Sequence, residues 1–213
     1  MRLILMGPVG SGKGTQAGLI STRFGLPHIS TGEIFRSNIK NNTELGKIAK
    51  EYIDKGELVP EELTNKLVAD RLSQDDCKKG FILDGYPRNV AQAEFLNTIT
   101  DVDLALMIDL SEEKIIARLS SRRMCGDCAQ PTSLEWMVEG KCEKCGGEVY
   151  IRDDDKPEVI KNRLQKQAVS KELIEFFKQK GVFEKIDATD EVEKTYELVK
   201  SVLDRVENEM GAK

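Results

Sequence analysis

Histidine is almost absent from this sequence, and so are long apolar runs. His28 is the single histidine among 213 residues, which excludes an HExxH protease site, a histidine-rich metal centre and any mechanism that needs two imidazoles. The longest apolar runs hold about five residues, far fewer than a membrane-spanning helix requires. We therefore expect a protein that is not embedded in a membrane and whose chemistry does not depend on imidazole.

An excess of positive charge is also missing. The chain carries 32 basic and 37 acidic side chains, for a net charge of −5 and a pI near 5.2. This balance argues against a polybasic protein that binds nucleic acid or a membrane surface. A hydrophobic share of 39% with 32% charged residues predicts a soluble globular protein. The N-terminal apolar stretch is too short for a signal peptide, so we expect a cytoplasmic protein.

Four of the five cysteines form two CxxC pairs, Cys125 with Cys128 and Cys142 with Cys145, separated by 13 residues. This spacing is close to that of a zinc ribbon, in which two knuckles supply four thiolates to one tetrahedral Zn²⁺. The alternatives are two disulfides or a redox-active CxxC, which the missing export signal and the duplicated pair disfavour. Four cysteine ligands leave no open coordination position, so zinc here would be structural.

Short apolar stretches alternate with amphipathic ones along the chain. Strands are predicted at residues 2–6, 81–83, 104–110 and 182–186, and helices at 15–24, 31–40, 44–54, 61–74, 89–97, 111–123, 157–180 and 190–208. This alternation predicts an α/β protein whose parallel sheet is covered by helices on both faces. His28 is expected in a loop between Pro27 and a further strand.

Two segments interrupt the alternation. Residues 30–59 hold two helices with no strong strand between them, and residues 123–153 hold the four paired cysteines. Both are predicted to be inserts in a single α/β core. The core domain would then consist of residues 1–29, 60–122 and 154–213.

A glycine-rich loop follows the first predicted strand and opens a helix, which is the context that makes a Walker A match credible. Its glycines allow backbone N–H groups to surround phosphate oxygens, and the helix N-terminus adds partial positive charge. Lys13 would bring a full charge to the β- and γ-phosphates. Gly14 stands at the usual Ser/Thr position, with Thr15 following. The predicted phosphate-binding residues are Gly10, Ser11, Gly12, Lys13, Gly14 and Thr15.

Five motifs follow in order along almost the whole chain. The Gly-Ser-Gly-Lys-Gly-Thr-Gln run that ends at Gln16 resembles the loop of adenylate kinase and its nucleoside-monophosphate kinase relatives. Four further segments resemble the family's STGD-x-x-R, DG[FY]PR-x-x-x-Q, Arg-x-x-x-Arg-Arg and Arg…Asp-Asp…Arg motifs: residues 30–36, 84–92, 118–123 and 152–163. The resemblance implies a P-loop core with a five-stranded parallel sheet flanked by helices, and two mobile inserts. These would be an AMP-binding insert at 30–59 and a zinc-bearing lid at 123–153.

The family reaction that the resemblance implies is Mg·ATP + AMP ⇌ 2 ADP, so the expected partners are small nucleotides and a magnesium ion. By resemblance, Asp84 would orient the waters on Mg²⁺, and Arg118 would stack on the ATP adenine. Asp190 would contact that adenine through its backbone carbonyl. The family resemblance also suggests a monomer.

The resemblance assigns most other roles to arginines, whose planar guanidinium suits bidentate phosphate contacts. Arg36 and Arg88 would hold the AMP phosphate, and Arg122, Arg152 and Arg163 would surround the ATP phosphates and the transferred group, with Arg152 and Arg163 also reaching AMP. Other residues expected to face AMP are Thr31, Glu57, Leu58, Val59, Gly85 and Gln92. Asp153 and Asp154 are expected to pair with basic residues of the core when the lid shuts.

The predicted lid departs from the family pattern. Relatives carry a Tyr-His-x-x-Phe-Asn-Pro-Pro-like run, whereas this chain has Gln-Pro-Thr-Ser-Leu-Glu-Trp at residues 130–136. The segment is too small to hold a core of its own, so four Zn–S bonds would replace one.

Two other functions remain open from the sequence. A related kinase could use UMP, CMP or GMP as acceptor, although Gln92 and Thr31 favour adenine. A zinc-ribbon nucleic-acid binder is disfavoured because residues 124–151 hold five acidic residues against two lysines.

Overall fold

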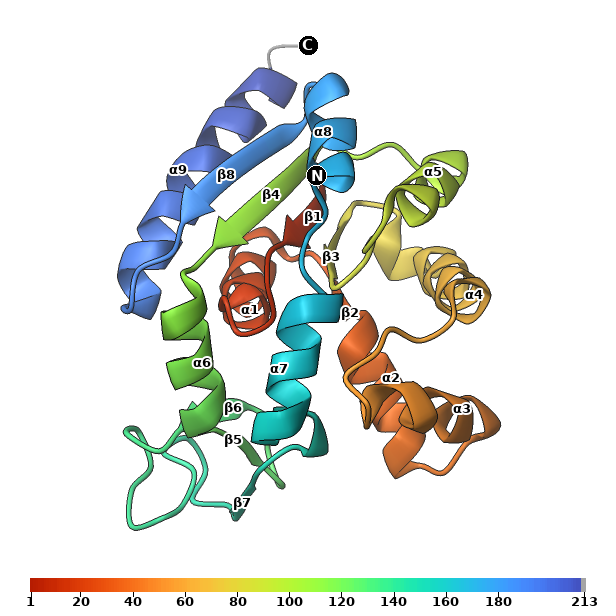
Figure 1. Ribbon diagram of the computed structural model, residues 1–213. Coiled ribbons are helices and arrows are strands. Elements are labelled where there is room, and N and C mark those ends of the chain that lie inside the picture. The colour runs from red at the N-terminus through yellow and green to blue at the C-terminus, as the bar shows by residue number, and fades with distance from the viewer. Residues whose placement is uncertain (212–213) are drawn as a thin grey trace.

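The computed structural model describes residues 1–211, which form an α/β fold (Figure 1). The central sheet has five strands in the order β2-β3-β1-β4-β8, and all neighbouring pairs are parallel. Their bounds are Arg2–Met6 (β1), His28–Ser30 (β2), Phe81–Asp84 (β3), Leu104–Asp109 (β4) and Phe183–Asp187 (β8). The predicted five-stranded parallel sheet flanked by helices is confirmed.

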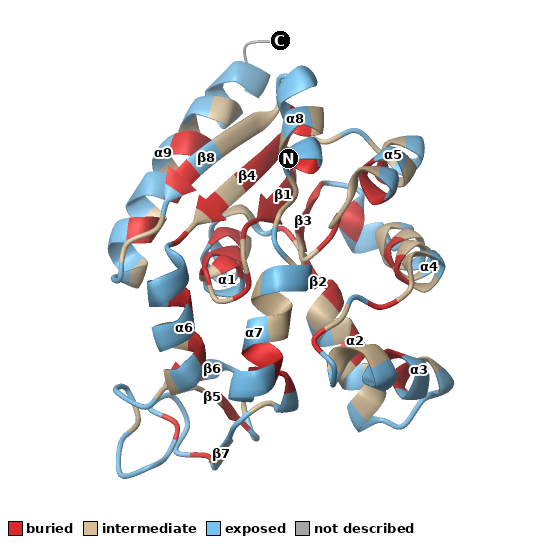
Figure 2. Cartoon of the chain, viewed as in Figure 1, coloured by how far each residue is buried: buried red, intermediate tan, exposed pale blue. Residues whose placement is uncertain are grey.

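Helices cover both faces of this sheet because successive side chains of a strand point to opposite sides. Leu3 and Leu5 pack in one cluster with α1 (Lys13–Phe24) and α9 (Val192–Gly211). Ile4 and Met6 pack in the other with α4 (Glu61–Leu72), α5 (Val90–Ile99) and α8 (Lys171–Gln179). Figure 2 shows buried residues along the sheet and on the helices beside it. No helix among residues 1–211 is long and apolar enough to cross a membrane.

Two predictions about secondary structure are wrong. His28 begins strand β2, where a loop was expected, and this strand has only three residues before α2 starts. The single helix predicted at 157–180 is two helices, α7 (Pro157–Lys166) and α8. Ser170 caps the second helix by accepting a hydrogen bond from the backbone N–H of Leu173 at 3.2 Å, and this cap stabilises a new helix start at that point.

The two predicted inserts each have secondary structure of their own. Helices α2 (Thr31–Lys40) and α3 (Glu44–Ile53) pack on each other around a small cluster that contains Phe35, Ala49 and Val59. The cysteine segment forms an antiparallel sheet of β5 (Arg122–Cys125), β6 (Pro131–Ser133) and β7 (Val149–Tyr150), with β5 in the middle. Helix α6 (Glu112–Ser121) leads into this sheet. Both units lie at the same end of the molecule, with α6 and α7 near them (Figure 1).

Candidate active site

The glycine loop lies between β1 and α1, and its backbone requires glycine at three positions. Gly7, Gly10 and Gly12 have φ values of 141°, 80° and 96°, which other residues rarely adopt. A Cβ on Gly7 would lie 2.2 Å from the carbonyl oxygen of Ile108. The tight turn therefore leaves backbone N–H groups at the start of α1, where an anion can accept from them.

Lys13 is buried at the first position of α1. Its Nζ donates to the carbonyl oxygen of Pro8 at 2.6 Å. Burial lowers the pKa of Lys13 to about 7; Asp84 opposes this shift, while the charges of Arg88 and other arginines add to it. A phosphate next to Nζ would restore the charged form, so the site favours an anionic ligand.

This lowered pKa makes stability depend on pH. Below about pH 7, Lys13 is charged in both states, and the full cost of burying that charge is present in the folded protein. Above pH 7 the unfolded chain binds more protons at this position, up to the ordinary lysine pKa, so the free energy of unfolding rises with pH. We expect the nucleotide-free protein to gain about 2 kcal/mol relative to Lys13→Met between pH 7 and pH 9. Urea unfolding of both proteins at each pH measures this difference, and a constant difference would contradict the shift.

Every residue predicted to bind nucleotide lines one cleft of about 1010 Å³. The cleft runs from the glycine loop past α2 and the end of β3 to the lid strands and α7. Six arginines reach it: Arg36, Arg88, Arg118, Arg122, Arg152 and Arg163. Burial, followed by the charge of Arg152, lowers the pKa of Arg36 to about 10. So many partly buried cations close together favour a polyanionic ligand.

Two carboxylates in the 3-10 turn Asp153–Asp155 hold some of these arginines. Asp155 accepts bidentate hydrogen bonds from Arg122, one of them from Nε at 2.8 Å. Arg163 Nη1 lies 3.1 Å from oxygens of both Asp154 and Asp155. The pairing expected of Asp154 with a basic residue of the core is confirmed. Asp153 does not pair with the core: within the described residues, its ion pair is with nearby Lys156 at the surface, at 2.9 Å. Asp155 was not predicted to pair, although the Arg…Asp-Asp…Arg motif includes it.

Arg118 and Asp190 lie at the other end of the glycine loop. Arg118 Nη2 donates to the carbonyl oxygen of Thr189 at 2.6 Å, and Nη1 lies 3.4 Å from that of Ser11. The Asp190 carboxylate instead faces an exposed Lys114 at 2.7 Å. The guanidinium is thus fixed against the loop, and the Asp190 side chain points to a surface pair.

Four of the residues predicted to contact AMP form a hydrogen-bonded group at the end of β3. Thr31 Oγ1 donates to the Gly85 carbonyl oxygen at 3.2 Å, and Arg88 Nε donates to the same atom at 2.8 Å. Buried Gln92 accepts at Oε1 from the backbone N–H of Arg88 at 2.7 Å. This orients the Gln92 carboxamide and leaves its Nε2 to donate to a ligand.

Residues 55–57 contact α7 closely, a feature that the sequence did not indicate. Lys166 Nζ lies 2.5 Å from Glu57 Oε1, and Gln167 Nε2 donates to the Gly56 carbonyl oxygen at 2.9 Å. Asn162 donates to the carbonyl oxygen of Lys55. Helix α7 thereby connects the segment before Leu58 to the arginine cluster that includes Arg163.

Gly56 is the tightest point of this contact. Its φ is +71°, and a Cβ there would lie 2.9 Å from Arg163 Cγ and 3.1 Å from the Val159 carbonyl oxygen. We expect Gly56→Ala to displace Arg163 and to lower turnover about tenfold. Steady-state kinetics measure this. Gly181→Ala is the matched control, because Gly181 has φ +70° and no atom within 4 Å of its Cβ position; an equal loss in both variants would contradict the role of the contact.

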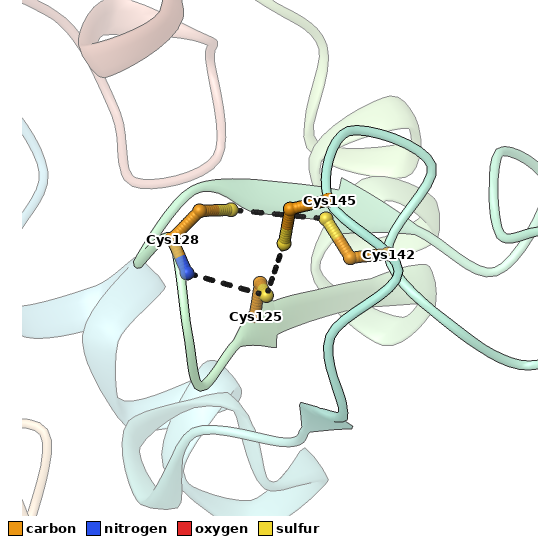
Figure 3. A group of neighbouring side chains, drawn as sticks. All are labelled: Cys125, Cys128, Cys142 and Cys145. Carbon is orange, nitrogen blue, oxygen red and sulfur yellow. Dashed lines mark hydrogen bonds between the residues drawn. The ribbon is translucent and has the colours of Figure 1, made fainter.

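The four paired cysteines converge in the lid segment (Figure 3). Their Sγ atoms all lie within 4.8 Å of one another, with Cys125 to Cys145 at 3.4 Å and Cys128 to Cys142 at 3.8 Å. These separations are too long for disulfides and match the sulfur spacing of about 3.8 Å around a tetrahedral Zn²⁺. The four thiols therefore fit a bound metal ion.

Together, the glycine loop at a helix start and the arginine-lined cleft define a P-loop nucleotide-binding protein. The sequence model of one family, described as Adenylate kinase, matches residues 5–182. A protein of Thermoanaerobacter sp. (strain X514) named "Adenylate kinase" is 48% identical over 212 residues, covering 95% of this chain and 98% of its own. One of Caldicellulosiruptor bescii with the same name is 51% identical over 191 residues, covering 85% and 89%. The chain belongs to the adenylate kinase family.

Proposed function

We propose that the protein catalyses reversible transfer of the terminal phosphoryl group from Mg·ATP to AMP, which gives two ADP. The observation that carries this proposal is that a single cleft contains both the glycine loop and the residues expected to hold AMP. Arg88, Arg122 and Arg163 lie close enough to Lys13 to influence its pKa. A donor phosphate at Lys13 and an acceptor phosphate at Arg88 would thus meet within one cationic site, as in-line transfer requires.

The chemistry requires positioning and charge neutralisation more than proton transfer. An AMP phosphate oxygen is ionised at neutral pH, so no general base is needed, which agrees with a chain that has one histidine. Lys13, Arg122, Arg152 and Arg163 would stabilise the negative charge on the transferred group. In the structure, Asp154 and Asp155 pair with all three of these arginines, although Arg152 is at the longest distance, 4.0 Å from Asp154. We propose that incoming phosphate oxygens share those guanidinium groups, which the carboxylates keep in place beforehand.

The donor nucleotide would lie along the glycine loop. Backbone N–H groups of residues 10–15 and Lys13 would hold its phosphates, and Arg118 with the backbone at Asp190 would face its base. The acceptor would lie between Arg36 and Arg88 with its base toward Gln92. Thr31, Gly85 and residues 57–59 would line that pocket.

Two metals complete the proposal. Asp84 is mostly buried at the end of β3, and its Oδ2 lies 3.5 Å from a Cβ placed on Gly14. Burial alone would raise its pKa, but the nearby His28 and the charge of Lys13 outweigh burial and lower it. One ionised carboxylate beside the glycine loop fits a Mg²⁺ ion that keeps most of its water and binds through nucleotide phosphates. The four lid thiolates fit Zn²⁺, which would supply a rigid cross-link and no chemistry.

Formation of ADP from ATP with AMP, CMP, UMP or GMP as acceptor tests the proposal, with metal analysis of the same sample. We expect AMP to be the best acceptor and about one zinc per chain. A preference for another monophosphate would make the protein a different nucleoside-monophosphate kinase. No transfer to any of them, together with salt-dependent DNA or RNA binding, would instead favour the nucleic-acid function.

A substitution of Arg88 tests binding of the acceptor nucleotide separately from binding of the donor nucleotide. We expect Arg88→Ala to raise the KM for AMP at least tenfold and to change the KM for ATP less than twofold, because its guanidinium serves the acceptor phosphate. Arg71→Ala is the control, since Arg71 pairs with Asp76 outside the cleft. Equal changes in both KM values would contradict the assigned side of the cleft.

We also propose a monomeric, cytoplasmic enzyme that has no nucleic-acid partner. The acidic lid supports the last point, since it would repel a phosphate backbone. Analytical ultracentrifugation, which measures the mass of the protein in solution, tests whether it is monomeric.

A further inference from the structure

His28 and Asp84 approach each other across two neighbouring strands. Strands β2 and β3 run parallel, with His28 beside Ile82 and Ser30 beside Asp84. His28 therefore lies two residues before the residue that pairs with Asp84. Its Nε2 atom is 3.5 Å from Asp84 Oδ2. Both side chains line the cleft and are mostly buried, at 17% and 13% exposed.

The His28 Nε2 atom needs a partner. It is buried and makes no hydrogen bond within the described residues, and leaving a buried polar atom unpaired costs about 1–3 kcal/mol. Asp84 Oδ2 lies within ion-pair distance of His28 Nε2. Hydrogen bonds of active sites are often long without ligand and shorten when the ligand binds, so a small rotation of either side chain closes this gap.

We propose that His28 is a positioning residue for Asp84: its Nε2–H donates to Asp84 Oδ2 and fixes the carboxylate beside the glycine loop, where it would orient the waters of a hydrated magnesium ion. This inference rests on the function proposed above. An N–H donor fixes the orientation of the carboxylate, as outer-shell partners of metal-binding groups commonly do. The other charges at Asp84 come from Lys13 on α1 and Arg88 after β3, and both serve the phosphates in the proposed reaction. His28 alone among these three groups is free to orient the carboxylate.

The single histidine makes the proposal directly observable. In a ¹H–¹⁵N spectrum of the imidazole at pH 8, the one histidine signal reports which ring nitrogen carries the proton. We expect a proton on Nε2, and a change in the chemical shift of this nitrogen in Asp84→Asn. We also expect Mg²⁺ added to the ADP-bound protein to move the signal further than ADP alone does. A ring whose Nε2 carries no proton would overturn the proposal, and this measurement needs no variant that risks misfolding.

Two variants separate positioning from packing. His28→Gln keeps an N–H donor at similar reach, and His28→Leu removes it at similar size. With Mg²⁺ titrated calorimetrically into ADP-saturated protein, we expect the Leu variant to raise the dissociation constant about tenfold and the Gln variant to raise it less than threefold. The KM for AMP should stay within twofold in both. An equal loss in both variants, an unchanged Mg²⁺ constant in the Leu variant, or a parallel rise in the KM for AMP would overturn the role.

These measurements also distinguish this inference from the proposed function. If the wild-type protein transfers phosphate to AMP but the ring carries its proton on Nδ1, only the role of His28 is wrong. If AMP is not an acceptor, the proposed function is wrong, while the tautomer and the response to Mg²⁺ still decide whether His28 positions Asp84.

Discussion

Replacing Lys13 by alanine should lower turnover by about 10²–10³-fold, the loss that follows removal of one preorganised charged donor in an active site. Lys13 is the buried cation at the start of α1, and its Nζ is held by the carbonyl oxygen of Pro8 at 2.6 Å. An ammonium group that is already positioned needs little rearrangement as negative charge develops on the transferred group. ADP formation at saturating ATP and AMP measures the effect.

The matched control for this substitution is Lys78→Ala. Lys78 is 74% exposed in a surface pair with Asp75, and such pairs contribute little to stability. We expect Lys78→Ala to keep turnover within twofold and Lys13→Ala to fold normally, because removing a buried cation whose pKa is lowered does not destabilise the nucleotide-free protein. Normal turnover in Lys13→Ala, with ADP still formed from ATP and AMP, would show that the glycine loop is not the donor site.

Local sequence signals predicted most of the fold. The apolar runs that became β1, β3, β4 and β8 are long enough to be identified by composition, and the predicted helices at 31–40 and 44–54 match α2 and α3 closely. Strand β2 was harder to predict, because the three residues between Pro27 and the start of α2 show no periodicity, and the last of them, Ser30, also caps the helix. The break between α7 and α8 depends on the Ser170 cap, a signal inside a stretch whose hydrophobic pattern continues.

The candidate site, like the fold, could be predicted only in part from local sequence signals. Motif positions predicted which side chains line the cleft, because the loop, Arg88 and Arg163 belong to segments with recognisable spacing. The contacts between those segments could not be predicted in this way. The approach of His28 to Asp84 depends on the register of two strands more than fifty residues apart in the chain, and the contact of Gln167 with Gly56 depends on how α7 lies over the insert.

Overall charge was a poor guide to the ligand. The chain has a net charge of −5, yet its cleft collects six arginines and Lys13. With four thiolates and one Zn²⁺ the net charge would become −5 − 4 + 2 = −7, with the added negative charge confined to the lid. The field that a nucleotide meets is set by charges within about 10 Å at ordinary salt, so an acidic protein can still bind polyanions.

If the four lid cysteines hold Zn²⁺ as proposed, its removal should have the largest effect on stability. Structural zinc sites of four ligands contribute roughly 10 kcal/mol or more in apparent binding free energy. Two large apolar side chains between β6 and β7 add little burial, since Trp136 and Val138 are 51% and 63% exposed. We expect Cys142→Ser, or treatment with a chelator, to lower the melting temperature of the lid by more than about 10 °C, and to leave measurable phosphoryl transfer wherever the lid can still close over the cleft.

Cys77→Ser is the control that isolates the metal. Cys77 is buried under the guanidinium of Arg71, with Nη1 at 3.0 Å from its Sγ, and lies outside the cluster of four. The variant should keep its zinc and its chelator-sensitive melting, whereas Cys142→Ser should lose both, because three thiolates do not close a tetrahedral structural site. Metal content and scanning calorimetry with and without chelator measure this. If the four thiolates cross-link the lid through zinc, removing the metal must remove that cross-link and lower the melting temperature. A metal-free protein that melts at the same temperature as the zinc form would show that the four cysteines do not stabilise the lid in this way.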